Sequence, residues 1–339
     1  MNVKDLLRCR QQCIGFAMCM IVLYHLSIDT PFPFLEQLKT TFYGGVDLCL
    51  FASGIGCYHS LDRNPDIGTF MKKRFQRLAP TYLVFICFWL MLEALRGNFT
   101  IHMALGNILG IQNFTGLGSF FNWYISAILL FYLLAPYLKQ IADRTTAGSK
   151  WGFLLLFVLA SVPFWGSHTY IITVTRLPVF YLGVLFGQYS KTEQPIPTKF
   201  WGSAIAALLV GAAFLSAALR YAPNQLWSNG LYWYPFILIA PALYAAVSAL
   251  FHFLNRTGKL RLLDAALTVI GDYSFEVYLV HISVVDMLNL CAQYLQLQDL
   301  DNLISALAVV LTAVGCFVLR RLVKFCTCCC RALHKSITG

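Results

Sequence analysis

Charged residues are scarce in this sequence. Only 12% of the 339 residues are Asp, Glu, Lys or Arg, whereas 58% are hydrophobic, and the mean hydropathy is +0.66. Ordinary soluble domains carry about 25% charged and about 45–50% apolar residues. The shortage of charge therefore excludes a soluble globular protein and predicts an all-α polytopic membrane protein in the lipid bilayer.

Other signals are also missing. No internal repeat or low-complexity linker divides the chain, so we expect one transmembrane domain over 1–320. The first apolar run has no small-residue cleavage site, so we expect no cleaved signal peptide. No cysteine pair falls in the predicted outer loops, so we expect no disulfide. The string CTCCC (326–330) lies in a short basic tail over 321–339. A reduced or acylated tail is the first interpretation. Thiolate metal binding is the alternative, but one short cysteine cluster without a second ligand pair is a weak signal, so we expect no metal.

Apolar stretches near the ~20 residues that cross about 30 Å of hydrocarbon recur along the chain. Ten spans are predicted, and an even number places both termini on one side; the sixth is short. Their ranges are 12–28, 44–61, 78–95, 121–138, 151–165, 178–189, 200–219, 232–253, 268–286 and 303–319.

Basic residues give the orientation. On the side away from the termini the predicted topology places only four: Lys39, Arg96, Arg176 and Arg220. The remaining 21 of the 25 flank the termini side, which the positive-inside rule makes cytoplasmic. The net charge of +10 is thus mainly a topology signal, and we expect no nucleic-acid partner.

Two ionisable residues lie at the outer ends of the first two predicted spans. His25 ends the apolar run IGFAMCMIVLYHLS, and Asp47 lies in GGVDLCLFASG. Ionisable groups inside a membrane are costly and are kept when paired or functional. A carboxylate beside an imidazole fixes its tautomer and raises its basicity, as a general base requires. A buried pair that only clamps two helices is the equal alternative.

A basic cluster precedes the third predicted span, in FMKKRFQRLAP. Lys73, Arg74 and Arg77 are ordinary cytoplasmic flanking charges on the simplest interpretation. Arg74 and Arg77, however, are three residues apart and share a helix face, so together they can bind phosphates bidentately. A cytoplasmic phosphorylated cofactor fits such a face.

The order of several strings resembles acyltransferase family 3, the membrane-bound O-acyltransferases of bacterial surface glycans. They occur in family order along nearly the whole chain: GFAMCMIVLYH (15–25), FYGGVDLCLFASGIG (42–56), FMKKRFQRLAP (70–80), FNWYISAILLFYLLAP (121–136), TRLPVFYLGVLFG (175–187) and IGDYSFEVYLVH (270–281). One string alone is a weak signal, whereas six in order are a strong one.

The resemblance implies ten-span enzymes of the bacterial inner membrane that move an acyl group, usually acetyl, from cytoplasmic acyl-CoA to a carbohydrate hydroxyl reached from outside. It implies that His25 is the essential base with Asp47 as its partner, and that Arg74 and Arg77, with Lys73 beside them, contact coenzyme A. Further motif positions with less settled roles are Trp123, Ser126, Arg176, Glu276, Tyr278 and His281. Arg176 or Ser126 is expected to stabilise the oxyanion.

One position departs from the family pattern. Members commonly carry an arginine eleven residues before the histidine, where this chain has Ile14. Arg10 lies one helical turn earlier, about 6 Å along the axis and roughly on the same face. We therefore expect either that Arg10 contacts the cofactor or that it only anchors the helix at the interface.

The other intramembrane polar residues need partners. For Arg176 an ion pair with Glu276 or Asp286 is as strong an expectation as a catalytic role. Glu276 and His281 are five residues apart on one helix, diverge by about 140°, and are not expected to pair. Tyr232 and Trp233, among other aromatics near span ends, are expected to form interfacial belts.

Two other classes of function stay open. The same polar residues could form the proton relay of a transporter that exports a glycan or small anion. No paired broken helices in related halves are visible, which disfavours it. The third class is a catalytically inactive relative that binds a glycan or partner; the presence of His25 and Asp47 argues against it, and the missing arginine favours it.

Overall fold

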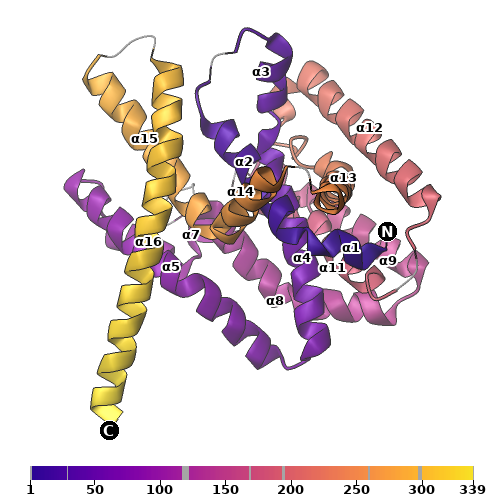
Figure 1. The fold of residues 1–339 in the computed structure, drawn as a ribbon, viewed down its shortest axis with the longest axis horizontal. Helices are drawn as coiled ribbons and strands as arrows, with labels where there is room; N and C mark the ends of the chain where they lie inside the picture. The colour runs from indigo at the N-terminus through magenta and orange to yellow at the C-terminus, as the bar shows by residue number, and fades with distance from the viewer. Residues whose placement is uncertain are drawn as a thin grey trace.

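The computed structural model describes residues 2–28, 30–116, 122–167, 169–192, 195–258, 260–296 and 300–338, with the side chains of 331 and 333–338 left aside. The chain is 83% helical, and no strand forms in the part that is described. Because lipid offers no hydrogen bonds to the backbone, helices satisfy their polar groups internally. The predicted all-α membrane fold is confirmed (Figure 1).

Within the described ranges, eight helical segments are long and apolar enough to cross a membrane. Six coincide with or lie within single helices, α5 (Ile67–Leu95), α8 (Trp123–Arg144), α12 (Thr198–Tyr221), α13 (Phe236–Thr257), α15 (Ser274–Tyr294) and α16 (Asp301–Thr338). The other two join a helix to a short neighbour: α9 (Ala147–Leu159) with η3 (Val162–Phe164), and α10 (Ile171–Val174) with α11 (Leu177–Tyr189).

The first two predicted spans fall on helices outside this set. Helix α2 (Arg10–His25) has only 16 residues, and α4 (Gly45–Arg63) is made more polar by Asp47, His59 and Asp62. The count of ten spans therefore stays a prediction. The predicted sixth span was too short, because the apolar segment begins at Ile171 rather than at residue 178.

The remaining helices are short. They comprise α1 (Val3–Arg8), α3 (Pro33–Lys39), η1 (Phe42–Gly44), α6 (Ile101–Leu109), α7 (Gln112–Thr115), η4 (Pro223–Gln225) and α14 (Arg261–Asp272). The predicted ninth span, 268–286, is broken at Tyr273, where α14 ends and α15 begins. This break lets α14 pack on α2 while α15 packs on α16.

Glycines permit the two closest crossings. A Cβ on Gly54 of α4 would lie 2.2 Å from the Phe180 carbonyl oxygen, and one on Gly183 of α11 would lie 2.2 Å from that of Phe51. Likewise, a Cβ on Gly15 of α2 would meet the Leu267 backbone of α14 at 2.0 Å. Small residues at helix crossings allow such close backbone packing in membranes. These contacts fix α2 and α4, the helices that carry His25 and Asp47.

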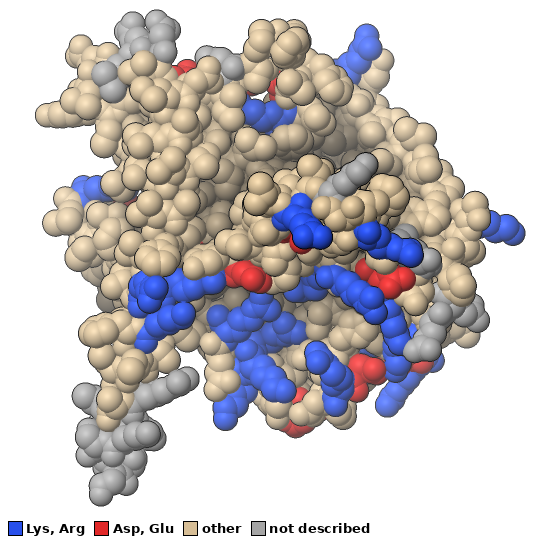
Figure 2. Space-filling view, in the orientation of Figure 1, with Lys and Arg blue, Asp and Glu red and all other residues tan. Residues whose placement is uncertain are grey.

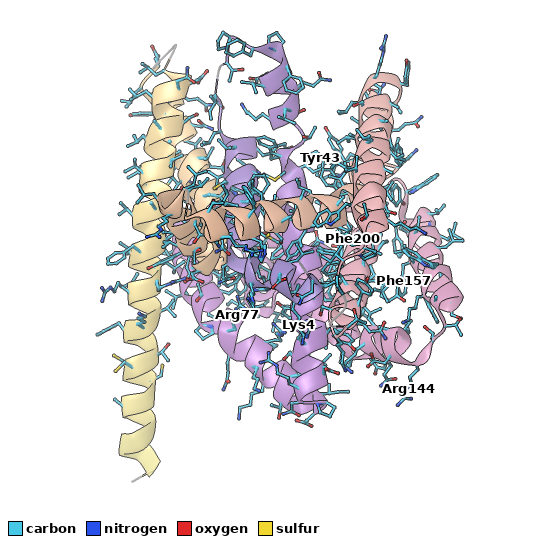
Figure 3. The ribbon with its side chains drawn as sticks, turned by 45° about the vertical axis from the view of Figure 1, so that its right-hand side comes forward. Lys4, Tyr43, Arg77, Arg144, Phe157 and Phe200 are labelled. Atoms are coloured by element: carbon cyan, nitrogen blue, oxygen red, sulfur yellow. The ribbon has the colours of Figure 1, made fainter. Side chains whose placement is uncertain are left out.

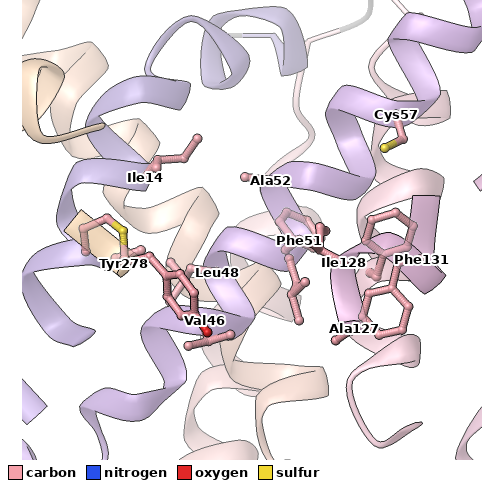
Figure 4. Packing of buried hydrophobic residues seen from close by; sticks show 14 of the residues in the cluster. Ile14, Val46, Leu48, Phe51, Ala52, Cys57, Ala127, Ile128, Phe131 and Tyr278 are labelled. Carbon is pink, nitrogen blue, oxygen red and sulfur yellow. The ribbon is translucent and has the colours of Figure 1, made fainter. Parts of the chain in front are cut away.

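One buried cluster joins α2, α4, α8, α11 and α15. Figure 4 shows part of it, with Phe51, Ile128 and Phe131 packed together and Tyr278 directed toward Val46. Phe51 and Phe131 are each only 1% exposed. The rigid packing leaves few ways for the polar residues between these helices to move.

Charge is concentrated at one end of the bundle. Lys and Arg gather in a band across the lower half of the face in Figure 2. In Figure 3, Lys4, Arg77 and Arg144 lie toward the lower end and Tyr43 toward the upper end. The band matches the side predicted to face the cytoplasm; the location of the termini there remains a prediction.

Helix α16 runs without a break across the predicted domain boundary at residues 320 and 321, down to Thr338. Cys326, Cys328, Cys329 and Cys330 are exposed on this extension as free thiols. The solvated tail stays a prediction, and the role of these cysteines stays open.

Candidate active site

Two adjacent cavities lie between α2, α4, α8 and α15. The inner cavity, of about 210 Å³, is lined by Arg10, Arg74 and Arg77 among others, and the outer cavity, of about 340 Å³, by His25 and His281 among others. Three residues line both cavities: Ile21, Val46 and Tyr278. The two spaces therefore meet at a shared wall of two aliphatic side chains and one tyrosine.

Basic residues from three helices converge on the inner cavity. Arg10 comes from α2, Arg74 and Arg77 from α5, and Arg320 from α16. The Arg74 guanidinium donates to the Gly56 carbonyl oxygen at 3.0 Å and lies over the rings of Phe70 and Tyr132, which holds it in place. Such a cluster suits an anion with several phosphates.

Isoleucine at residue 14, where the family pattern has an arginine, is consistent with this geometry. Ile14 is buried and lines the inner cavity, as does Arg10 one turn earlier on the same helix. The predicted shared face is therefore confirmed, and Arg10 brings a guanidinium to the cavity that an arginine at 14 would also reach. Lys73, by contrast, is exposed and does not line this cavity.

Sequence reasoning overlooked Arg320 as a site residue. Its place just after the last predicted span is typical of a flanking charge, yet its Nε donates to Glu276 Oε1 at 2.7 Å and its guanidinium stacks on Tyr273. Glu276 thus pairs with Arg320, so the expected alternative of a Glu276–Arg176 pair is wrong. The Glu276–Arg320 pair closes the side of the inner cavity formed by α15 and α16.

The structure places Asp47 against Arg176 rather than against His25. Asp47 Oδ1 lies 3.5 Å from Arg176 Nε, and the two side chains are 0% and 2% exposed. Neither carboxylate oxygen of Asp47 accepts a hydrogen bond from any described residue. The expected direct His25–Asp47 contact is therefore not formed, because the fully buried guanidinium takes the carboxylate as its counter-charge. Arg176 does not pair with Asp286 either.

Another group takes over the orienting role expected of Asp47. His25 Nδ1 lies 2.9 Å from the Ile21 carbonyl oxygen, one turn earlier on α2. Since a carbonyl only accepts, Nδ1 carries the hydrogen and Nε2 of the neutral ring keeps its lone pair. The backbone of His25's own helix therefore fixes the tautomer that a general base needs.

Tyrosine and tryptophan residues make up half of the described lining of the outer cavity. Arg176 is sandwiched there between the rings of Trp123 and Trp233, at 4.6 and 4.9 Å, and donates to the Ile172 carbonyl oxygen. Trp233 is only 2% exposed and Tyr232 also lines the cavity, so for these two the expected interfacial belt is wrong. Tyr43, which sequence reasoning overlooked, donates its hydroxyl to the Tyr232 carbonyl oxygen.

Ser126 and His281 have different surroundings. The Ser126 hydroxyl donates to the Gly110 carbonyl oxygen and accepts from the Asn113 amide, and it lines neither cavity. Its position is that of a structural tie between α7 and α8 rather than an oxyanion donor. His281 lines the outer cavity with its ring 5.1 Å from that of His25. As expected from their spacing, Glu276 and His281 do not pair.

A family model described as "Acyltransferase domain" matches residues 15–321. The matched region includes His25, His281, Asp47 and Arg320. Arg10 and Ile14 lie just before the matched region. Comparisons with curated proteins and with solved structures give no match. The family match covers nearly the whole chain, so the protein belongs to acyltransferase family 3 and is a membrane acyltransferase.

Proposed function

We propose that this protein transfers an acyl group, with acetyl as the first expectation, from cytoplasmic acyl-CoA to a carbohydrate hydroxyl that reaches the outer cavity. The single observation that carries the proposal is the pair of cavities that share Ile21, Val46 and Tyr278, one lined by arginines and the other by His25. A bacterial cytoplasmic membrane, with surface or exported glycan on its far side, is the proposed setting.

The donor enters from the basic side. Its phosphates are held by Arg10, Arg74 and Arg77, since guanidinium groups bind phosphate oxygens bidentately. Its pantetheine arm extends past Ile21, Val46 and Tyr278, which brings the thioester next to His25. The apolar character of this shared wall suits the uncharged arm and excludes water from the thioester.

The acceptor hydroxyl then reacts at His25. Nε2 takes the hydroxyl proton while the oxygen attacks the thioester carbonyl carbon. The tetrahedral intermediate collapses as the C–S bond breaks, and the imidazolium returns the proton to the departing coenzyme A sulfur. Arg176, held by two indole rings and by Asp47, is the candidate for stabilising the oxyanion. Transfer through an acyl-histidine intermediate is a variant of the same scheme.

The donor site is tested at residues 10 and 14. We expect Arg10→Gln to raise the KM for acetyl-CoA by about tenfold, because it removes one charge-assisted hydrogen bond to phosphate. Adding Ile14→Arg to that variant should restore most of the affinity, since residue 14 lines the same cavity. Both effects are measured with purified protein, by the release of the coenzyme A thiol from acetyl-CoA.

The matched control is Lys72→Gln, which removes a charge from an exposed residue of α5 outside the cavity. It should leave the KM for acetyl-CoA near the original value. If Arg10→Gln and Lys72→Gln behave alike, the inner cavity does not hold the donor.

A further inference from the structure

The two histidines of the outer cavity have the same local geometry. His25 Nδ1 lies 2.9 Å from the Ile21 carbonyl oxygen, and His281 Nδ1 lies 2.8 Å from the Val277 carbonyl oxygen, each four residues earlier. Both Nδ1 atoms are therefore donors, and each neutral ring has Nε2 as its remaining acceptor. The cavity wall contains two imidazole lone pairs rather than one.

The second lone pair has no partner among the residues that the structure describes. His281 is 0% exposed, and no described residue hydrogen-bonds its Nε2. A buried acceptor without a donor costs free energy, so such an atom in a native structure calls for an explanation. Its place in the wall of the proposed reaction cavity indicates that a bound molecule supplies the donor.

Nearby side chains do not supply that donor. The Tyr43 hydroxyl hydrogen is directed to the Tyr232 carbonyl oxygen, and Arg176 donates to the Ile172 carbonyl oxygen and lies beside Asp47. Neither side chain hydrogen-bonds His281 Nε2. The ring of His25 is the neighbour of His281 at 5.1 Å with an interplanar angle of 71°. One hydroxyl hydrogen satisfies one nitrogen only, so a molecule that hydrogen-bonds both Nε2 atoms must present two donors close to each other.

We propose that the acceptor presents a vicinal diol to these two histidines. The reacting hydroxyl donates to His25 Nε2, and the hydroxyl on the neighbouring carbon donates to His281 Nε2. His281 is then a positioning residue that selects which hydroxyl is acylated. This inference rests on the proposed function and narrows its substrate class from any sugar hydroxyl to one with a free hydroxyl beside it.

The first test uses the glycan of the producing cell, freed of ester groups by mild alkali. Half of it is treated with periodate and borohydride, which cleave vicinal diols and leave isolated hydroxyls intact. With purified protein and labelled acetyl-CoA, we expect transfer to the untreated glycan and at least a tenfold loss with the treated one. Equal transfer to both overturns the diol. Transfer to neither contradicts the proposed function and the diol with it.

The second test separates positioning from a structural role. We expect His281→Ala to raise the KM for the untreated glycan by about tenfold while the KM for acetyl-CoA is unchanged, because one hydrogen bond to the acceptor is lost. His281→Gln, whose amide oxygen also accepts a hydrogen bond, should restore much of the affinity for the glycan. His102→Ala, at an exposed position, is the control. An equal rise in both KM values, or none, overturns the proposal.

A third measurement does not depend on any variant. NMR spectroscopy of the product locates the new ester on the sugar ring. The diol proposal predicts that the adjacent carbon bears a free hydroxyl. An ester flanked on both sides by carbons without a free hydroxyl overturns it.

Discussion

Replacing His25 with alanine should reduce acyl transfer by about 10²- to 10⁴-fold, the usual contribution of a positioned general base. Two groups of this region are engaged elsewhere. His281 is assigned to the neighbouring hydroxyl of the acceptor, and Asp47 is paired with Arg176. Transfer of labelled acetyl from acetyl-CoA to de-esterified glycan measures the loss.

The control for this variant is His102→Ala, which removes an exposed imidazole and should leave transfer intact. Protein amount and thermal unfolding must be equal in the two variants. Full transfer by His25→Ala at normal protein levels contradicts the mechanism. If the unaltered protein were a transporter instead, it would release no coenzyme A thiol from acetyl-CoA.

The second large effect concerns stability. Asp47→Asn should lower the free energy of unfolding by about 3–5 kcal/mol, because it leaves the fully buried Arg176 without a counter-charge. Removing both charges in Asp47→Asn/Arg176→Gln should cost less than Asp47→Asn alone, since no unpaired charge remains. Thermal and denaturant unfolding of the purified protein in detergent give the comparison.

Helix α4 supplies a matched control at its other end. Asp62 pairs with Lys191 and Lys139 at the surface, with its side chain 29% exposed. Asp62→Asn should change stability by at most about 1 kcal/mol, the usual range for exposed pairs. If Asp47→Asn is as stable as Asp62→Asn, the buried pair does not hold α4 and Arg176 together.

The sequence predicted helix faces better than it predicted contacts between helices. Helical periodicity was enough to place Arg10 and Ile14 on one face, and both line the inner cavity. The Asp47 partner was not predictable in the same way. His25 does end α2, and Asp47 does lie in the first turn of the neighbouring α4, but sequence spacing does not determine how each helix is rotated about its axis. The close approach at Gly54 and Gly183 fixes that rotation for α4.

Interfacial aromatics were the other difficulty. Trp233 lies in the loop just before α13, a position typical of a membrane-interface belt. Its burial over Arg176 depends on the fold of 223–235 across the bundle, which no local pattern encodes. The role of Arg320 was not predictable either, because a basic residue at the end of a span usually marks the cytoplasmic boundary. Both residues were visible only once distant segments were packed together.

The central claim is that donor and acceptor meet at His25 from opposite sides of the membrane. The most direct test seals labelled acetyl-CoA inside vesicles that carry the purified protein and supplies de-esterified glycan outside. The account predicts labelled glycan in the outer compartment, and none with His25→Ala. Labelled glycan that forms only when both substrates share one compartment would contradict it.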